Sequence, residues 1–258
     1  MLGAIAGDII GSVYEKNPVK QLNFPLFQED SRFTDDTVLT VAVADALLST
    51  SAFEDKVKFY AQRYPAAGYG RTFISWMTGA IEGPYISWGN GSAMRVSPVG
   101  FAYEQLTDVM KMAEASAAIT HNHPEGNKGA QAVAACIYLA RTGFGKPLIK
   151  DHVERIFGYN LAQTLDEIRP DYSFDVSCQG SVPQSIQAFL ESHNWESAVR
   201  NAVFLGGDAD TMACIAGSIA EAFYGGVPVE IELEVMGRIP EEFRAVISDF
   251  YKEYPWLD

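Results

Sequence analysis

Two acidic clusters stand near opposite ends of the sequence, and both are rich in oxygen donors. The first reads Thr34-Asp35-Asp36-Thr37, and the second reads Gly207-Asp208-Ala209-Asp210-Thr211. Carboxylates and hydroxyls suit magnesium, calcium or manganese rather than zinc. Capping a helix needs one Asp or Thr, whereas each cluster offers several ligands. We expect the two clusters to form one metal site, in which four carboxylates suit two divalent ions better than one.

A glycine-rich segment between the clusters is a candidate anion site. Residues 88–95 read Trp-Gly-Asn-Gly-Ser-Ala-Met-Arg and enter what resembles a short helix. Backbone N–H groups in such a turn can bind phosphate oxygens, although a turn without a ligand has the same signature. Arg95 could brace this loop or contact a ligand.

Two of the four histidines lie in the segment Thr120-His121-Asn122-His123-Pro124. A zinc site would need two further Cys or His ligands at suitable spacing, and none is visible. Contact with a ligand phosphate or ribose and capping of the following helix remain alternative roles for these histidines.

Gly3, Gly7, Gly11 and Glu15 recur every four residues near the N-terminus, and Asp8 lies close to the helical face they would share. Glycine inside a helix costs about 1 kcal/mol relative to alanine, so this spacing indicates a close approach to the backbone. Tight helix packing explains Gly3 and Gly7. Glu15, which begins a long loop, is the better functional candidate.

These groups must be positioned by helices, because apolar residues recur at spacings of three and four along most of the chain. We predict an all-α fold, with Pro183 in the first turn of its helix. The predicted helices span 37–48, 53–64, 107–119, 129–139, 183–190, 195–204, 212–224 and 240–251. The longest predicted loops are 16–33, 65–72, 81–95 and 169–181, and loops of such length are commonly functional.

The composition fits a soluble globular chain with a large core. The 258 residues are 48% hydrophobic and carry a net charge of −14, which argues against a nonspecific nucleic-acid or membrane surface. Cys136, Cys178 and Cys214 are expected to be reduced, packed thiols. With no linker visible, we expect a single domain over residues 1–258, in a cytoplasmic protein that acts as a monomer.

Taken together, the motifs resemble those of the ADP-ribosylglycohydrolase family, which includes dinitrogenase reductase-activating glycohydrolase and the animal ADP-ribosyl-acceptor hydrolases. They occur in family order and span residues 3 to about 226. The matching segments are Ala-Gly-Asp8-x-x-Gly-Ser-x-x-Glu15, Phe-Thr34-Asp35-Asp36-Thr, Gly-Asn90-Gly91-Ser92-Ala-Met-Arg95, Thr-His121 and Gly-Gly-Asp208-Ala-Asp210-Thr211.

The resemblance implies an orthogonally packed, all-α bundle with a binuclear metal cleft. Two Mg²⁺ ions, for which Mn²⁺ could substitute, would be held by Thr34, Asp35, Asp36, Asp208, Asp210 and Thr211. The chain departs from the family at Ala209, where Thr is frequent, and in its individual loop from Lys16 to Arg32. The loop leaves the acceptor open.

The implied reaction is hydrolysis of the bond between ADP-ribose and its acceptor, most simply a protein side chain such as arginine or serine, or else a small molecule. Its transition state is oxocarbenium-like, which calls for proton transfer. Glu15 is the general acid/base candidate, and Asp36 is both a ligand and a possible water-positioning base.

The resemblance also implies where ADP-ribose binds. Asn90, Gly91 and Ser92 would bind the pyrophosphate, with His121 beside it. Tyr85, Trp88 and Phe174 are candidates for stacking on adenine, although a core position is the commoner role for such residues. The alternative functions are a metal-dependent ADP-ribose binding module without turnover and a magnesium-dependent nucleotide phosphohydrolase.

Overall fold

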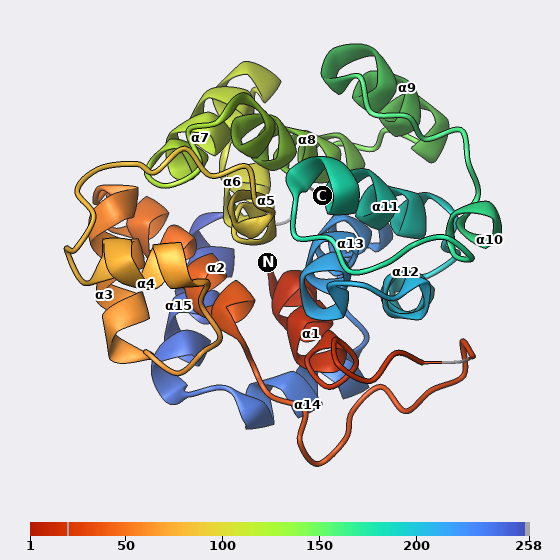
Figure 1. Cartoon of the computed structure of the whole chain (residues 1–258), viewed down its shortest axis with the longest axis horizontal. Helices are drawn as coiled ribbons and strands as arrows, with labels where there is room; N and C mark the ends of the chain where they lie inside the picture. The colour runs from red at the N-terminus through yellow and green to blue at the C-terminus, as the bar shows by residue number, and fades with distance from the viewer. Residues whose placement is uncertain (20, 256–258) are drawn as a thin grey trace.

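The computed structural model describes residues 1–19 and 21–255, and over these residues the protein is helical without a named strand (Figure 1). An isolated β-bridge between Gly89 and Ser177 is the extended pairing seen there. The predicted all-α fold is therefore confirmed. The helices are α1 (Leu2–Gly11), α2 (Asp35–Leu48), α3 (Phe53–Arg63), α4 (Arg71–Met77), α5 (Gly91–Met94), α6 (Ser97–Ala102), α7 (Leu106–Ala118), α8 (Pro124–Arg141), α9 (Lys146–Phe157), α10 (Leu165–Ile168), α11 (Cys178–Leu190), α12 (Trp195–Leu205), α13 (Ala209–Tyr224), α14 (Val229–Arg238) and α15 (Glu241–Glu253).

Each predicted helix overlaps an observed one, and three of them extend one residue beyond it, but the start of α11 was predicted wrongly. This helix begins at Cys178, because the Ser177 hydroxyl accepts a hydrogen bond from the backbone N–H of Gly180 and caps it. Pro183 therefore lies inside the helix rather than in its first turn. Proline removes one backbone donor, and α11 continues because it is buried against neighbouring helices, including α8 and α13.

The glycines of α1 bring this helix into direct backbone contact with α13. A Cβ atom at Gly7 would lie 2.1 Å from the carbonyl oxygen of Ala213, and one at Gly11 would lie 2.4 Å from Cα of Asp210. The packing role predicted for Gly3 and Gly7 is confirmed and extends to Gly11. The close approach carries the second acidic cluster to the C-terminal end of α1.

Glu15 does not share the helical face of the glycines. Helix α1 ends at Gly11, and residues 12–14 form a turn before Glu15. The four-residue spacing wrongly predicted a shared helical face for Glu15, because the helix ends before this residue.

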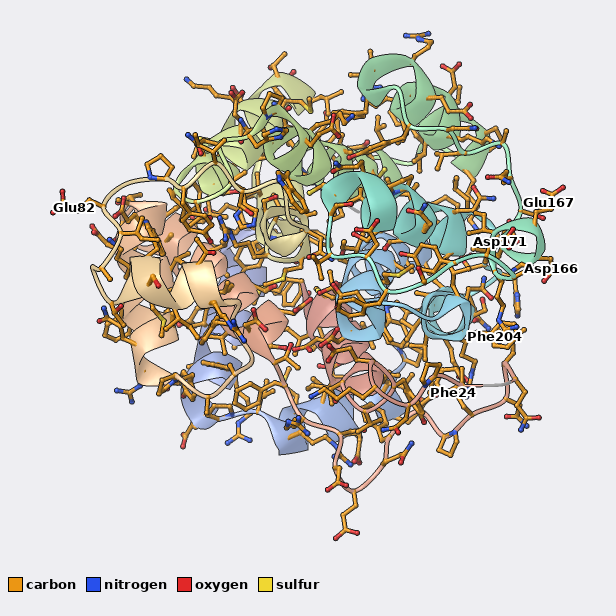
Figure 2. The ribbon with its side chains drawn as sticks, viewed as in Figure 1. Phe24, Glu82, Asp166, Glu167, Asp171 and Phe204 are labelled. Carbon is orange, nitrogen blue, oxygen red and sulfur yellow. The ribbon has the colours of Figure 1, made fainter. Side chains whose placement is uncertain are left out.

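Helices α2 and α13 lie in the interior, so the acidic residues at their N-termini are enclosed by the fold. Figure 1 shows α13 between α1, α11 and α12, and it contacts all three. Other acidic side chains, such as Glu82, Asp166, Glu167 and Asp171, project from the periphery (Figure 2). The negative charge is thus partly dispersed over the surface and partly concentrated inside.

The three cysteines are buried and unpaired, as expected. None of the described helices combines the length and apolar character needed to cross a membrane.

Candidate active site

One cleft of about 700 Å³ is lined by both acidic clusters and by residues of all four predicted long loops. All six predicted metal ligands line it, as do Glu15, Asn90, Gly91 and His121. The cleft is lined by Ser12, Glu15, Lys16, Arg32, Thr34, Asp35, Asp36, Leu39, Ala66, Ala67, Gly68, Gly70, Arg71, Thr72, Phe73, Tyr85, Ile86, Ser87, Trp88, Gly89, Asn90, Gly91, Met94, Arg95, His121, Phe174, Val176, Asp208, Asp210 and Thr211.

The N-terminus of α2 is held in place by Asp8, whose role the sequence alone did not reveal. The Asp8 carboxylate accepts hydrogen bonds from the backbone N–H and the hydroxyl of Thr34, at 2.9 and 2.7 Å, and from the N–H and hydroxyl of Thr37. Thr34 in turn caps the helix through the backbone N–H of Asp36. Asp8 therefore ties α1 to the first acidic cluster.

The second cluster opens α13 after a turn that requires glycine. Gly206 and Gly207 have φ values of +91° and +78°, which L side chains rarely adopt. The Thr211 hydroxyl donates a hydrogen bond to Oδ2 of Asp36 at 3.3 Å. This bond joins the two acidic clusters directly.

Carboxylates are packed together in the cleft, and none of them forms an ion pair within the described residues. Asp8, Asp36 and Asp210 each place an oxygen within 4.8 Å of the others. Burial, together with repulsion by Asp210 and Asp8, raises the pKa of Asp35 to about 8 and the pKa of Asp36 well above its usual value. Burial and Asp210 likewise raise the pKa of Asp208.

This donor set fits hard divalent cations. Oδ1 of Asp36 is buried and has no hydrogen-bond partner among the described residues, an arrangement that is costly without a ligand. Oxygen donors at two helix starts are the groups that magnesium prefers. Asp8 is close enough to be a metal ligand, but both of its oxygens already accept hydrogen bonds. We therefore assign it the role of positioning the first acidic cluster.

The glycine-rich turn contributes less through its side chains than we expected. The Asn90 amide donates to Oδ2 of Asp208 at 2.7 Å, so it braces the second acidic cluster. The Ser92 hydroxyl is buried and donates to the carbonyl of Gly126 at 2.7 Å, and Ser92 is absent from the cleft lining. Contact between the Ser92 hydroxyl and a ligand is therefore not supported, whereas Gly91 faces the cleft.

The structure separates the roles of the two histidines. His123 accepts a hydrogen bond from the backbone N–H of Glu125 and caps α8. His121 lines the cleft instead, and a Cβ atom at Gly91 would lie 3.1 Å from its Nε2. Burial, with a smaller contribution from the charge of Arg95, lowers the pKa of His121 well below its usual value. The imidazole is therefore neutral near pH 7.

Glu15 lies at the edge of the cleft and is partly buried. Burial and the nearby Asp210 raise its pKa, while Lys16 and Arg32 oppose that shift. Its carboxylate has no side-chain hydrogen bond within the described part of the chain. Burial at the cleft edge therefore favours the protonated form of Glu15, which is the form that a general acid requires.

Aromatic side chains form part of the cleft rim. Trp88 and Phe174 line the cleft with 49% and 54% of their surface exposed, so a core position is wrong for both. Tyr85 also lines the cleft, and its ring centroid lies 6.1 Å from that of His121.

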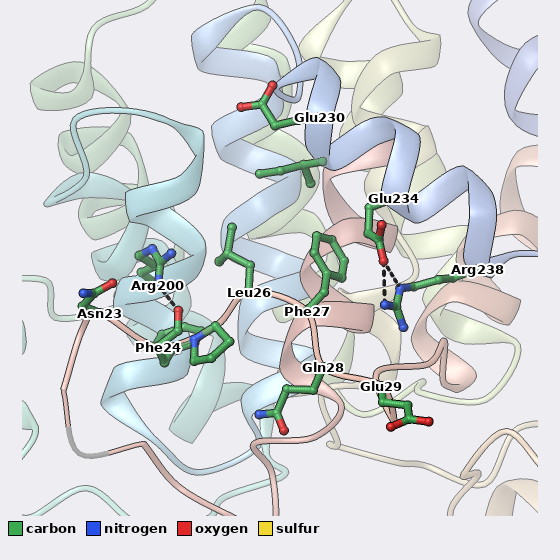
Figure 3. Close-up of a pocket in the computed structure, with 12 residues that line it drawn as sticks. Asn23, Phe24, Leu26, Phe27, Gln28, Glu29, Arg200, Glu230, Glu234 and Arg238 are labelled. Carbon is green, nitrogen blue, oxygen red and sulfur yellow. Dashed lines mark hydrogen bonds and ion pairs between the residues drawn. The ribbon is translucent and has the colours of Figure 1, made fainter.

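A second hollow, of about 890 Å³, lies between residues 23–29 and α14 (Figure 3). Its two cations are already engaged: Arg238 bonds Glu234, and Arg200 donates to the carbonyl of Phe24. It contains neither acidic cluster, so the smaller cleft is the candidate active site.

The sequence model of the ADP-ribosylglycohydrolase family matches residues 1–256. The chain belongs to the ADP-ribosylglycohydrolase family. It is therefore a hydrolase of glycosidic bonds, and the family resemblance of its motifs is confirmed.

Relatives of this ADP-ribosylglycohydrolase match over most of its length. ADP-ribosylhydrolase ARH3 of Mus musculus is 27% identical, over 97% of this chain and 86% of that protein. ADP-ribosylarginine hydrolase Tri1 of Pseudomonas putida is 25% identical, over 89% of this chain and 71% of that protein.

A solved structure described as an ADP-ribosylglycohydrolase-related protein complex has the same fold. The match has a TM-score of 0.73 at 23% identity and covers 98% of this chain and 97% of that one.

Proposed function

We propose that this ADP-ribosylglycohydrolase uses two Mg²⁺ ions to remove ADP-ribose from a modified protein side chain, and that Mn²⁺ can replace them. The ions would be held by Thr34, Asp35, Asp36, Asp208, Asp210 and Thr211. The observation that carries the proposal is the convergence of both acidic clusters on one cleft, with a buried oxygen of Asp36 left unpaired. When bound, the ions would supply positive charge that orients the ribose hydroxyls and offsets repulsion between the carboxylates and an anionic substrate.

The protein groups around the cleft support one direction for the bound substrate. The diphosphate would lie at the Gly89–Gly91 turn beside His121, and adenine would reach the exposed rings of Trp88 or Phe174. The ribose would then lie over the acidic clusters, and the acceptor would extend toward Glu15.

Glu15 would transfer a proton to the leaving group as the glycosidic bond breaks. Its raised pKa supports this role, because burial favours the protonated form that donates to a leaving group. Asp36 would orient the attacking water through its unpaired oxygen.

The charges at the acceptor end favour an uncharged linkage. Lys16, Arg32 and Arg71 are exposed side chains in the cleft lining, and no ion pair of Lys16 or Arg71 is present in the described chain. An ADP-ribosylated arginine retains a cationic guanidinium, which these side chains repel, whereas an O-linked serine is neutral. We therefore propose serine ahead of arginine as the acceptor.

The test is a panel of peptides carrying defined ADP-ribosyl linkages, incubated with the protein and Mg²⁺. The proposal predicts released ADP-ribose and an unmodified peptide, with faster release from serine than from arginine. Binding of ADP-ribose without release would instead identify a binding module, and release of inorganic phosphate or AMP would identify a phosphohydrolase.

We also propose that the protein acts in the cytoplasm, in keeping with its three unpaired, buried thiols.

A further inference from the structure

A fully buried arginine beneath the cleft is connected to His121 through one hydroxyl group. Nη2 of Arg95 donates to Oγ1 of Thr120 at 2.8 Å and to the carbonyl of Ser116 at 2.9 Å. Oγ1 of Thr120 lies 2.7 Å from Nδ1 of His121. Arg95 and Thr120 are completely buried, and His121 is 6% exposed. The row of groups therefore runs from the protein interior to the cleft surface.

The hydrogen bond from Arg95 restricts where the Thr120 hydroxyl can donate its own proton. Arginine can only donate, so Nη2–H of Arg95 occupies one lone pair of the Thr120 oxygen. Thr120 has one hydroxyl proton to donate, and among the described residues Nδ1 of His121, 2.7 Å away, is the acceptor hydrogen-bonded to its oxygen.

We infer that Arg95 and Thr120 are positioning residues that fix His121 as the Nε2–H tautomer, so that it donates a hydrogen bond to an oxygen of the ligand diphosphate. The inference rests on the proposed binding of ADP-ribose in this cleft. A neutral imidazole with Nδ1 accepting must carry its proton on Nε2.

Nε2 of His121 is placed to use that proton on a ligand. It lies against the turn, 3.1 Å from the position of a Cβ atom at Gly91 and 3.6 Å from that at Gly89. None of the hydrogen bonds of the described residues involves this nitrogen. A diphosphate oxygen only accepts hydrogen bonds, so it can accept the proton that Nε2 of His121 donates.

The charge of Arg95 adds a second reason for an anion at this place. Its Nε and Nη1 are buried without hydrogen-bond partners, and the guanidinium has no ion pair among the described residues. A buried cation without a carboxylate is costly, and a nearby anion reduces that cost. The guanidinium also polarises the Thr120 hydroxyl and strengthens its hydrogen bond to His121.

The decisive measurement is long-range ¹H–¹⁵N NMR of the imidazole nitrogens in the ligand-free protein. With four histidines in the chain, a His121→Gln sample assigns the signals. We expect Nδ1 of His121 to be unprotonated and Nε2 to carry the proton. Addition of ADP-ribose should shift the Nε2–H signal without changing the tautomer. An Nδ1–H tautomer in the free protein, or an Nε2–H signal that saturating ADP-ribose leaves unmoved, would overturn the inference.

Two substitutions at Thr120 separate the hydroxyl from packing. Thr120→Val removes the hydroxyl at nearly constant shape, so the Nε2–H population should fall and the Kd for ADP-ribose should rise about tenfold or more. Thr120→Ser should restore both values. Thr142→Val, at the end of α8 and outside the cleft lining, is the matched control and should change neither.

The outcomes also distinguish this inference from the proposed function. A Thr120→Val protein that folds and keeps the wild-type tautomer and affinity would refute the role of Thr120. If Thr120→Val does not fold, the wild-type tautomer and its response to ADP-ribose decide the question. Failure of wild type to bind ADP-ribose would refute the proposed function, while the free-protein spectrum still reports the tautomer.

Discussion

Glu15 offers the sharpest single-residue test of the proposed chemistry. Glu15→Gln keeps the size of the side chain but cannot transfer a proton, so kcat should fall about 10²–10⁴-fold while ADP-ribose and Mg²⁺ still bind. Steady-state kinetics and calorimetry measure the two effects. Glu29→Gln, in the same loop but outside the cleft, makes an equal change in net charge and should leave kcat unchanged. If the kcat of Glu15→Gln is within a fewfold of the wild-type value, another group must transfer the proton.

Asp36 should show opposite effects in the absence and presence of metal. Asp36→Asn removes one of several mutually repelling buried carboxylates, so the melting temperature in chelator should rise. The same variant should lose Mg²⁺ binding, metal-dependent stabilisation and turnover. Scanning calorimetry with and without Mg²⁺ measures this, and Asp249→Asn, on an exposed carboxylate of α15, serves as the control. Undiminished Mg²⁺ binding by Asp36→Asn would exclude Asp36 as a ligand.

The residue types of the two acidic clusters were sufficient to predict that their carboxylates and hydroxyls line one cleft. Few other arrangements place so many oxygen donors at helix starts. Residue types did not predict which groups the side chains of Asp8 and Ser92 hydrogen-bond. The hydrogen bonds of Asp8 to Thr34 and Thr37 arise from packing of α1 against α2, and the Ser92 hydroxyl turns toward Gly126 of a helix distant in sequence. Such orientations depend on neighbours that a local motif does not contain.

At the scale of helices, contact between α1 and α13 positions the second acidic cluster. Gly7→Ala would place a methyl group 2.1 Å from the carbonyl of Ala213, so the helices must separate. We expect a loss of about 1–3 kcal/mol in the free energy of unfolding, measured by urea denaturation. Gly237→Ala, in α14 with no atom within 4 Å of the new methyl group, should instead stabilise the protein by up to about 1 kcal/mol. Equal effects from the two variants would show that the α1–α13 contact is not tight.

The turn before α5 should be sensitive to added volume. In Gly91→Val the branched side chain would meet the His121 ring, whose Nε2 lies 3.1 Å from the Cβ position. We expect weaker binding of ADP-ribose in a protein that retains its helical circular dichroism. Unchanged affinity by calorimetry would make this segment a turn without a ligand role.

Every predicted helix has an observed counterpart, but the prediction missed α9 and α14, of twelve and ten residues, as well as several short helices. The short helices α4, α6 and α10 each span seven residues or fewer, too few to establish a period. The start of α11 was missed because Ser177 and Pro183 both carry N-terminal signals, and the Ser177 cap forms in the fold.

At the scale of the whole molecule, the site exists because distant parts of the chain meet. Glu15, the first acidic cluster, the turn before α5 and the second acidic cluster line one cleft, although nearly the whole sequence separates the first from the last. The order of these motifs is visible in the sequence, but their convergence depends on the burial of α2 and α13.

Metal-dependent release of ADP-ribose tests the central claim most directly. The measurement is ADP-ribose liberated from a serine-ADP-ribosylated peptide by wild-type protein in chelator, and again after Mg²⁺ is restored. Because the clustered carboxylates need compensating charge, we predict turnover that is abolished by the chelator and recovered with Mg²⁺. Full turnover by the chelated, metal-free protein would contradict the account.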